Sequence, residues 1–176
     1  MQSLFFLQQN PILSIVSIVA RNPVCYVEYI KAYPNNTQEM ILISQVHDNI
    51  IKSYQVDFEN EQLRLRTEYS YGDKVNENTD IIFESYLAHL FENEQKDSII
   101  FDIEECTPTL FYEQNQELIE KNRNYCWPIS YHTTDTKKEL VKFIHRNGYK
   151  VFEISSSYGL CGWVLAKDMQ VSIAKV

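Results

Sequence analysis

Alternation of apolar and polar residues with a period of two constrains the fold of this chain more than any other feature. It is clearest over Gln62–Tyr69, where Leu63 and Leu65 alternate with Arg64 and Arg66. Successive side chains of a β-strand point to opposite faces of the sheet, so this pattern predicts a strand with one face in the core and one in water. Antiparallel sheets are the arrangement that accepts such strands.

The same alternation is found in the preceding part of the chain, over Met40–Val46 and Ile50–Phe58. These predicted strands are separated from one another by three residues each, at 47–49 and 59–61. Connections this short join antiparallel neighbours, so we expect the three strands to form a meander.

Other segments extend the predicted sheet. Ser98–Glu105 is expected to be a strand whose Ile99, Phe101 and Ile103 face the core. Further strands are predicted at Val24–Tyr29, Tyr149–Ile154, Gly162–Ala166 and Gln170–Ala174. Apolar residues in Asp80–Glu94 fit helical and strand spacing about equally, so the sequence leaves both structures open for this segment.

One helix is well marked, at Thr136–Asn147. Thr136 and Glu139 have the spacing of a capping box, and Gly148 is placed for the left-handed residue that ends a helix. The apolar stripe expected to lie on the sheet consists of Leu140, Phe143 and Ile144, with Lys137, Lys138, Lys142 and Arg146 in water.

A second, short helix is indicated near the start of the chain, where Asn10 and Pro11 resemble an N-cap and a first-turn proline and Asn22 follows the predicted end. Together these elements predict an α+β fold, largely an antiparallel β-sheet (meander) with two to four helices, one of them packed on the sheet. No linker or repeat interrupts the 176 residues, so a single globular domain over 1–176 is expected.

Composition supports a reduced, globular protein. Hydrophobic residues make up 44% of the chain and aromatic residues 13%, which is enough for a core. The four cysteines, Cys25, Cys106, Cys126 and Cys161, have no metal-finger spacing and are expected to be thiols. Residues 1–20 carry no charge, and without a basic start or an unbroken apolar run they predict neither a signal peptide nor a membrane span. We therefore expect a cytoplasmic protein.

Acidic residues are concentrated in one part of the chain. Residues 73–120 contain 13 Asp and Glu against Lys74 and Lys96, whereas residues 121–176 carry more basic than acidic residues. Such a field attracts cationic partners and repels nucleic acid, because phosphates need Lys and Arg. The alternative interpretation is a solvated face that only keeps the protein soluble.

No catalytic constellation stands out. Cys126 and His132 form the only nucleophile and base that lie close in sequence, and their surroundings match no protease signature. The run 155–163, which holds two of the four glycines, lacks the Lys of a phosphate-binding loop. Acid and base roles for Glu84, Asp102, Glu104 and His89, or a cation site of Asp102, Glu104 and Glu105, arise easily by chance in so acidic a region. No catalytic residue, metal or cofactor is therefore predicted.

Several segments prompt a comparison with a class of proteins. They are Tyr54, Asp57, Phe58, Leu63 and Leu65 in the meander, Phe83 with His89–Glu92, the strand Ile99–Glu105, and Ser156–Lys167. In these segments the small, acidic, sheet-rich chain resembles bacterial immunity proteins, which neutralise the toxin domains of contact-dependent or secreted antibacterial systems. This resemblance implies tight binding to one cognate toxin domain through an acidic surface. The basic residues at 121–176 depart from that pattern.

The predicted function is accordingly that of a non-enzymatic inhibitor that binds a cationic protein toxin, with no nucleic acid as partner and an oligomeric state left open. Expected partner-binding residues are the acidic Glu84, Glu92, Asp102, Glu104 and Glu105 and the aromatic Tyr86 and Tyr112. One alternative is a small-molecule binding module around Trp127 and Trp163. Another is an enzyme that uses Cys126 and His132 or the carboxylates.

Overall fold

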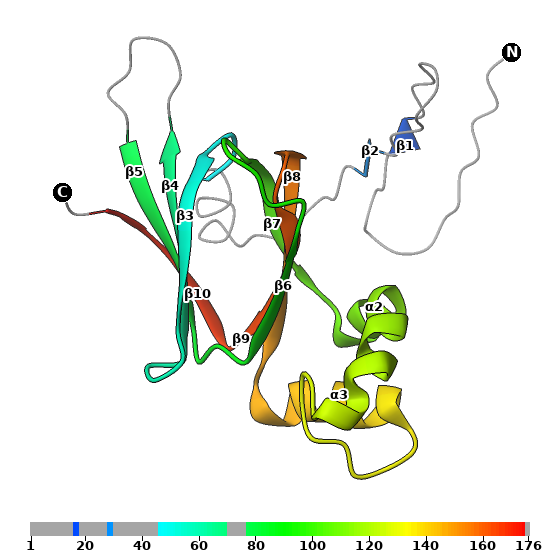
Figure 1. Cartoon of the computed structure of the whole chain (residues 1–176). Helices are drawn as coiled ribbons and strands as arrows, with labels where there is room; N and C mark the ends of the chain where they lie inside the picture. The colour runs from blue at the N-terminus through cyan, green and yellow to red at the C-terminus, as the bar shows by residue number, and fades with distance from the viewer. Residues whose placement is uncertain (1–15, 18–27, 30–45, 70–76, 175–176) are drawn as a thin grey trace, which may run out of the picture. The chain divides into compact units, whose positions relative to one another are not determined.

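The computed structural model describes residues 16–17, 28–29, 46–69 and 77–174 (Figure 1). It divides the chain into two compact units, Met1–Glu39 and Met40–Val176. A single domain over 1–176 stays a prediction, and the second unit holds every element that positions the candidate site.

In the first unit, β1 (Val16–Ser17) pairs antiparallel with β2 (Glu28–Tyr29). The predicted helix between Pro11 and Asn22 is wrong at Val16–Ser17, because these residues make strand pairs instead, and the rest of it lies outside the described residues. The strand predicted at Val24–Tyr29 is confirmed at its last two residues.

Over its described residues the second unit consists of strands, two α-helices and one 3-10 helix. Its elements are β3 (Ile50–Asp57), β4 (Gln62–Tyr69), β5 (Glu77–Glu84), β6 (Ala88–Glu92), β7 (Ile99–Cys106), α2 (Pro108–Asn122), the 3-10 helix η1 (Arg123–Tyr125), α3 (Thr136–Asn147), β8 (Lys150–Tyr158), β9 (Cys161–Ala166) and β10 (Asp168–Ile173). All strand pairs of its sheet are antiparallel, in the order β10-β5-β4-β3-β7-β8-β9-β6. The predicted α+β class is thus confirmed. The predicted meander is confirmed in part: β3, β4 and β5 are consecutive antiparallel neighbours, whereas β7 and β8 are connected through α2 and α3. The strand predicted at Met40–Val46 lies outside the described residues except for Val46, which is in a turn.

Two bent strands fold this sheet over on itself (Figure 1). One runs from β5 into β6 and turns at Ser85, whose φ is 51°. The other runs from β9 into β10 and turns at Lys167. At the bends the Leu87 N–H donates to the Leu165 carbonyl and the Lys167 N–H to the Glu84 carbonyl, at 2.8 and 2.9 Å. The two bent strands therefore pair along both of their halves.

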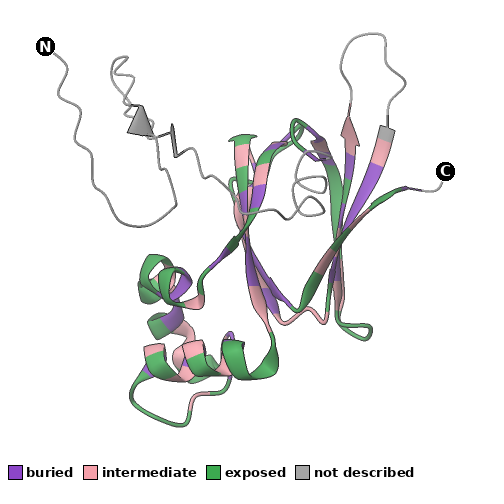
Figure 2. Ribbon diagram, turned by 180° about the vertical axis from the view of Figure 1, so that it is seen from behind, coloured by how far each residue is buried: buried purple, intermediate pink, exposed green. Residues whose placement is uncertain are grey.

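The two halves of the sheet enclose one core and carry a second core on the outside. The inner core includes Leu63 and Leu65 of β4 with Ile81 and Phe83 of β5, all fully buried. The second core lies between the helices and the outer face of β6, β8 and β9, and it contains Trp163. Figure 2 shows buried residues along the strands and exposed residues over much of α2 and α3.

Strand pairing decides the structure of the segment that the sequence left ambiguous. Residues 80–94 form the end of β5 and all of β6. Ile81 and Phe83 alternate into the inner core opposite Leu65 and Leu63 of β4, at a depth that no solvent reaches. Burial against an existing strand outweighs the equally good helical spacing, because local periodicity carries no information about the neighbour.

The strand predicted at Ser98–Glu105 is confirmed as β7, but its predicted inward face is partly wrong. Ile100 and Ile103 are buried, whereas Phe101 is 54% exposed. The register with β8 shifts between Ile99 and Ile100 and again between Ile100 and Asp102. A bulge adds a residue to one strand, so the alternation of faces changes there.

The helix predicted at Thr136–Asn147 is confirmed as α3, and Gly148 has the expected left-handed conformation, with φ 69°. Its N-cap differs from the prediction. Asp135 accepts the Lys138 N–H at 3.0 Å, while Glu139 accepts the backbone N–H groups of His132 and Thr133. Glu139 thereby fixes the preceding loop instead of closing a capping box.

Helix α2 was not predicted. It begins at Pro108 after the N-cap Thr107, whose hydroxyl accepts the Leu110 N–H. A kink interrupts it at Asn115, which has the non-helical angles φ −113° and ψ 15°. No helix among the described residues is long and apolar enough to cross a bilayer.

The last three predicted strands are confirmed as β8, β9 and β10 with small shifts at their ends. Strand β8 continues to Tyr158, four residues beyond the predicted end at Ile154. Gly159 then makes the turn with φ 83° and lies so close to Ser98 that a Cβ there meets the Ser98 hydroxyl at 2.2 Å.

Leu140→Ala is expected to lower the free energy of unfolding by about 3 kcal/mol, because Leu140 is fully buried in the second core and its truncation leaves a cavity. Phe143→Ala is expected to cost less, about 1 to 2 kcal/mol, since Phe143 is only half-buried and stacks on Tyr149. Urea titration of both variants measures the difference, and an equal cost would contradict this packing.

Candidate binding surface

Residues 73–120, which we call the acidic block, place several of their carboxylates on one face of the sheet. Ser155 of β8 is opposite Asp102, and Glu153 is opposite Glu104. These pairs alternate with Ile103 and Ile154 of the inner core, so the carboxylates are on the outer face. Glu92 of β6 is on the same face, because its neighbour Phe91 packs against the inner core. We call Glu92, Asp102, Glu104 and Glu153 the acidic face.

Charge repulsion and burial act together at the β7 side of the acidic face. Partial burial raises the pKa of the Asp102 carboxyl, and the neighbouring Glu104, by its charge and by a hydrogen bond, raises that pKa further. The Ile103 N–H, which donates to Asp102 at 2.8 Å, opposes the rise. Glu104 also lies directly opposite Glu153, a like-charge pair of the kind that destabilises a sheet.

Basic residues neutralise other parts of the acidic block. Lys137 of α3 pairs with Glu113 at 2.7 Å, Lys150 of β8 pairs with Glu105 at 3.1 Å, and Arg66 of β4 pairs with Asp80 at 3.3 Å. Within the described residues, Glu92 and Asp102 have no such Lys or Arg partner. Glu92 and Asp102 therefore contribute negative charge to the acidic face without a Lys or Arg beside them to neutralise it.

The structure brings together only part of the predicted partner-binding set. Glu92, Asp102 and Glu104 share the acidic face. Glu105 alternates to the other side of β7, and Glu84 and Tyr86 lie at the bend between β5 and β6. Tyr112 is 5% exposed, and its hydroxyl donates a hydrogen bond to Glu120 at 2.7 Å. Its ring is therefore part of the second core and is not available to a partner.

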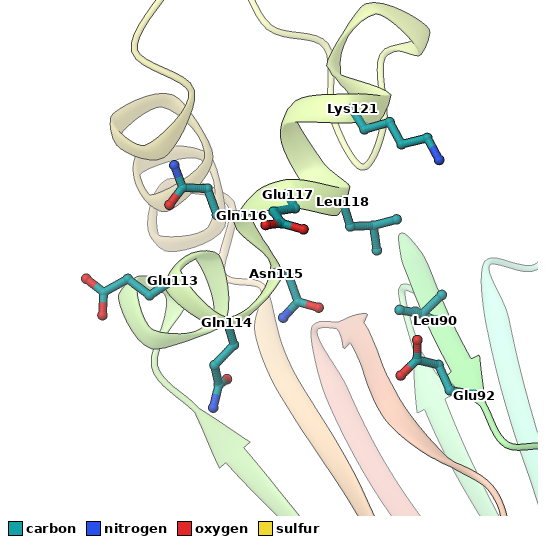
Figure 3. Close-up of a pocket in the computed structure, with 9 residues that line it drawn as sticks. All are labelled: Leu90, Glu92, Glu113, Gln114, Asn115, Gln116, Glu117, Leu118 and Lys121. Carbon is teal, nitrogen blue, oxygen red and sulfur yellow. The ribbon is translucent and has the colours of Figure 1, made fainter.

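Helix α2 and strand β6 border a cavity of about 670 Å³ next to the acidic face (Figure 3). It is lined by Leu90, Glu92, Glu113, Gln114, Asn115, Gln116, Glu117, Leu118 and Lys121. Leu118 points from α2 towards Leu90 of β6, while Glu113 points away from the strand. The Asn115 side chain at the kink accepts the Trp163 indole N–H at 3.0 Å, which ties the helix to the sheet. We call this the α2–β6 cavity.

A group of aromatic side chains lies along the inner side of β6. Its members, which we call the aromatic cluster, are Tyr54, Phe58, Tyr86, His89 and Phe91. Ring centroids are 5.1 Å apart for Tyr54 and Phe91 and 4.8 Å for His89 and Phe91. Tyr54 is 41% exposed and Phe58 78% exposed, so the cluster reaches the surface.

Polar contacts hold the aromatic cluster in place. Tyr54 donates its hydroxyl to Glu94 at 2.7 Å, and the Tyr86 hydroxyl is hydrogen-bonded to Nδ1 of His89 at 2.8 Å. Burial lowers the pKa of His89, against the opposing charge of Glu94. Sequence analysis did not assemble this cluster, because Tyr54 and β6 are far apart in the chain and no periodic signal links them.

The structure does not bring together the cysteine and histidine considered for catalysis or the pocket considered around the tryptophans. Cys126 and His132 are both exposed, and no hydrogen bond or ion pair joins them in the described structure. Trp127 and Trp163, predicted to enclose a ligand pocket, pack against each other at 5.6 Å, and Trp163 is 4% exposed. Among the described residues no group of three or more His, Cys, Asp and Glu is arranged to hold a metal ion.

Comparison with known proteins adds no family to this geometry. No protein-family model matches the chain, no curated protein matches its sequence, and no solved structure matches its fold.

Asp102→Asn is expected to raise the free energy of unfolding at pH 7, by up to about 1 kcal/mol, the scale of like-charge contacts on a sheet. The folded-state pKa of Asp102 lies above its usual 3.8, so the ionised carboxylate destabilises the fold at pH values above that raised pKa. The advantage of the variant should shrink as pH falls through the raised pKa and be absent below 3.8. Urea titrations from pH 7 to pH 3 measure this, and a pH-independent difference would contradict it.

Proposed function

We propose that this protein is a non-enzymatic inhibitor that binds a cationic protein domain, of the kind formed by bacterial toxins, through the acidic face. The observation that carries the proposal is the clustering of four carboxylates, Glu92, Asp102, Glu104 and Glu153, on one sheet face, where the charge of Glu104 acts on Asp102 and Glu153 lies opposite Glu104. Like charges that face each other do not stabilise a sheet, so replacing one of these residues would cost the fold little stability. Their presence therefore favours a role in binding.

Repulsion between the carboxylates of such a face favours the binding of a cationic partner. Carboxylates crowded in the unbound protein raise its free energy, and a cationic partner removes that repulsion on binding. Complementary charge also speeds association and disfavours anionic competitors. Lysines neutralise Glu105 and Glu113, which lie off this face, whereas Glu92 and Asp102 on it have no Lys or Arg partner within the described residues.

Affinity in protein complexes comes mainly from a few aromatic and Arg anchors and less from rim charges. The predicted anchor Tyr112 is buried, and Tyr86 is half-buried with its hydroxyl bonded to His89. Tyr54 and Phe58 in the aromatic cluster are more exposed and are better placed to supply apolar contact area.

The double variant Asp102→Lys, Glu104→Lys is expected to slow association with the cationic partner about tenfold or more at low salt and to weaken the salt dependence of the association rate. The first partner to test is the protein encoded by the neighbouring reading frame, by stopped-flow mixing and by growth of cells that co-express both proteins. Loss of protection in those cells should accompany the slower association.

Matched controls decide whether the position of the charge matters. Glu59→Lys changes an exposed acid in the β3–β4 turn and should leave the association rate near that of the wild type after correction for net charge. Lys138→Glu with Lys142→Glu tests the outer side of α3 in the same way. Unchanged association kinetics in the Asp102→Lys, Glu104→Lys variant would refute the proposed surface. Loss of protection only in the Lys138→Glu, Lys142→Glu variant would refute it as well.

A small-molecule binding module is the second candidate, favoured by the size of the α2–β6 cavity, which falls in the range of ligand pockets. A specific ligand would raise the thermal stability of the isolated protein. Stabilisation that Leu118→Trp abolishes, without any effect of Asp102→Lys, would favour this candidate over the inhibitor.

A further inference from the structure

Strand β6 presents an unpaired edge between two recognition features. It pairs with β9 along one side only, and within the described part of the chain no strand pairs with its other side. The outer face of β6 lines the α2–β6 cavity through Leu90 and Glu92, and its inner face contributes His89 and Phe91 to the aromatic cluster. An edge of this kind is a template for another strand.

The direction of the backbone groups shows which residues form that edge. The Leu90 carbonyl lies against Gly162 of β9, so close that a Cβ on Gly162 meets it at 2.0 Å. Within an antiparallel strand, the N–H and C=O groups of one residue point to the same side and those of its neighbours to the opposite side. The N–H and C=O groups of His89 and Phe91 therefore point to the unpaired edge.

We propose that the partner's recognition element is an extended basic segment that adds a strand along this edge of β6. The inference rests on the proposed function and names the chemistry of the partner at the same site. Main-chain hydrogen bonds to His89 and Phe91 provide affinity. Alternate side chains of the added strand fall on the two faces of β6, where they meet the α2–β6 cavity on one side and the aromatic cluster on the other.

Both faces favour cations on the added strand. On the outer side, the carboxylates that line the cavity, Glu92, Glu113 and Glu117, outnumber Lys121, its one cation among the described residues. With the apolar Leu90 and Leu118 they suit an Arg, which has an aliphatic stem and a charged head. On the inner side, the rings of the aromatic cluster and the Glu94 carboxylate attract a guanidinium or ammonium group. Strand β10 also ends the sheet, but the cavity and the aromatic cluster both lie at β6.

The test uses a synthetic peptide of about ten alternating Arg and Thr residues, long enough to span β6, and a matched Glu and Thr peptide as control. Binding to the full chain is measured by calorimetry, and amide exchange is followed by NMR. The basic peptide is expected to bind, the acidic one not, and the amides of His89 and Phe91 should become protected in the complex.

Substitutions separate the backbone contribution from that of the side chains. Phe91→Ala removes the ring, whereas Phe91→Pro removes the ring and the outward N–H, and proline is tolerated at such an edge position. We expect Phe91→Pro to weaken binding about tenfold more than Phe91→Ala. Ile173→Pro on β10 is the control. The Ala174 N–H donates to Asn78 of β5, so the neighbouring Ile173 amide points to the free side of β10 and its loss should not matter.

The results separate two hypotheses, strand addition along β6 and binding of a cationic partner by the acidic face. Equal binding by the Phe91→Ala and Phe91→Pro variants, or peptide binding without protection of His89 and Phe91, overturns strand addition and leaves the acidic face intact. Absence of any preference for the basic peptide overturns both. If Phe91→Pro unfolds, His89→Pro against His89→Ala gives the same comparison. A dimer whose formation protects the same amides without peptide would make a second copy the occupant and overturn the proposal.

Discussion

The pairing of two bent strands is the interaction on which the rest of this structure depends. Where β5 turns into β6 and β9 into β10, the bonds from Leu87 to Leu165 and from Lys167 to Glu84 keep the ladder continuous around the corner. Strands β3 and β7 share one ladder pair, Ile50 and Ile99, and three backbone hydrogen bonds next to it join residues 48–51 to Ser98 and Ile100. The ladders of the bent strands are longer, with six pairs between β10 and β5 and five between β6 and β9. The bent strands create the enclosed inner core, and they also leave β6 exposed at its far side.

Sequence reasoning was most successful where a segment's environment is uniform along its length. Strand β4 has one buried and one wet face, and α3 has an apolar stripe with a glycine after its end, so both were predicted with their correct limits. Phe101 was misplaced because a bulge is a property of the strand pair and not of the single strand. Helix α2 was missed because it is broken at Asn115 and its polar residues are distributed around it, which weakens the periodic signal.

Prediction from the sequence was less successful for the candidate site than for the fold, because the site depends on contacts between distant segments. The charge count found the acidic block but could not tell which carboxylates are neutralised, because Lys137 and Lys150 come from the C-terminal third of the chain. The predicted set therefore mixed Glu92, Asp102 and Glu104, which share a face, with residues that lie elsewhere. The aromatic cluster depends on contacts between β3 and β6 across the folded sheet, and only the three-dimensional structure brings those residues together.

Carboxylates next to the open edge of β6 also reduce the risk of aggregation that such an edge brings. A free edge is a site of uncontrolled pairing, and natural sheets protect such edges with charge. Negative charge from Glu92 and Glu117 beside β6 disfavours pairing with a second copy of this acidic chain, because the two edges repel each other. The same charge favours a basic strand. Repulsion between identical copies and attraction for a cationic partner thus follow from one arrangement, which allows an edge to remain accessible for recognition without promoting aggregation.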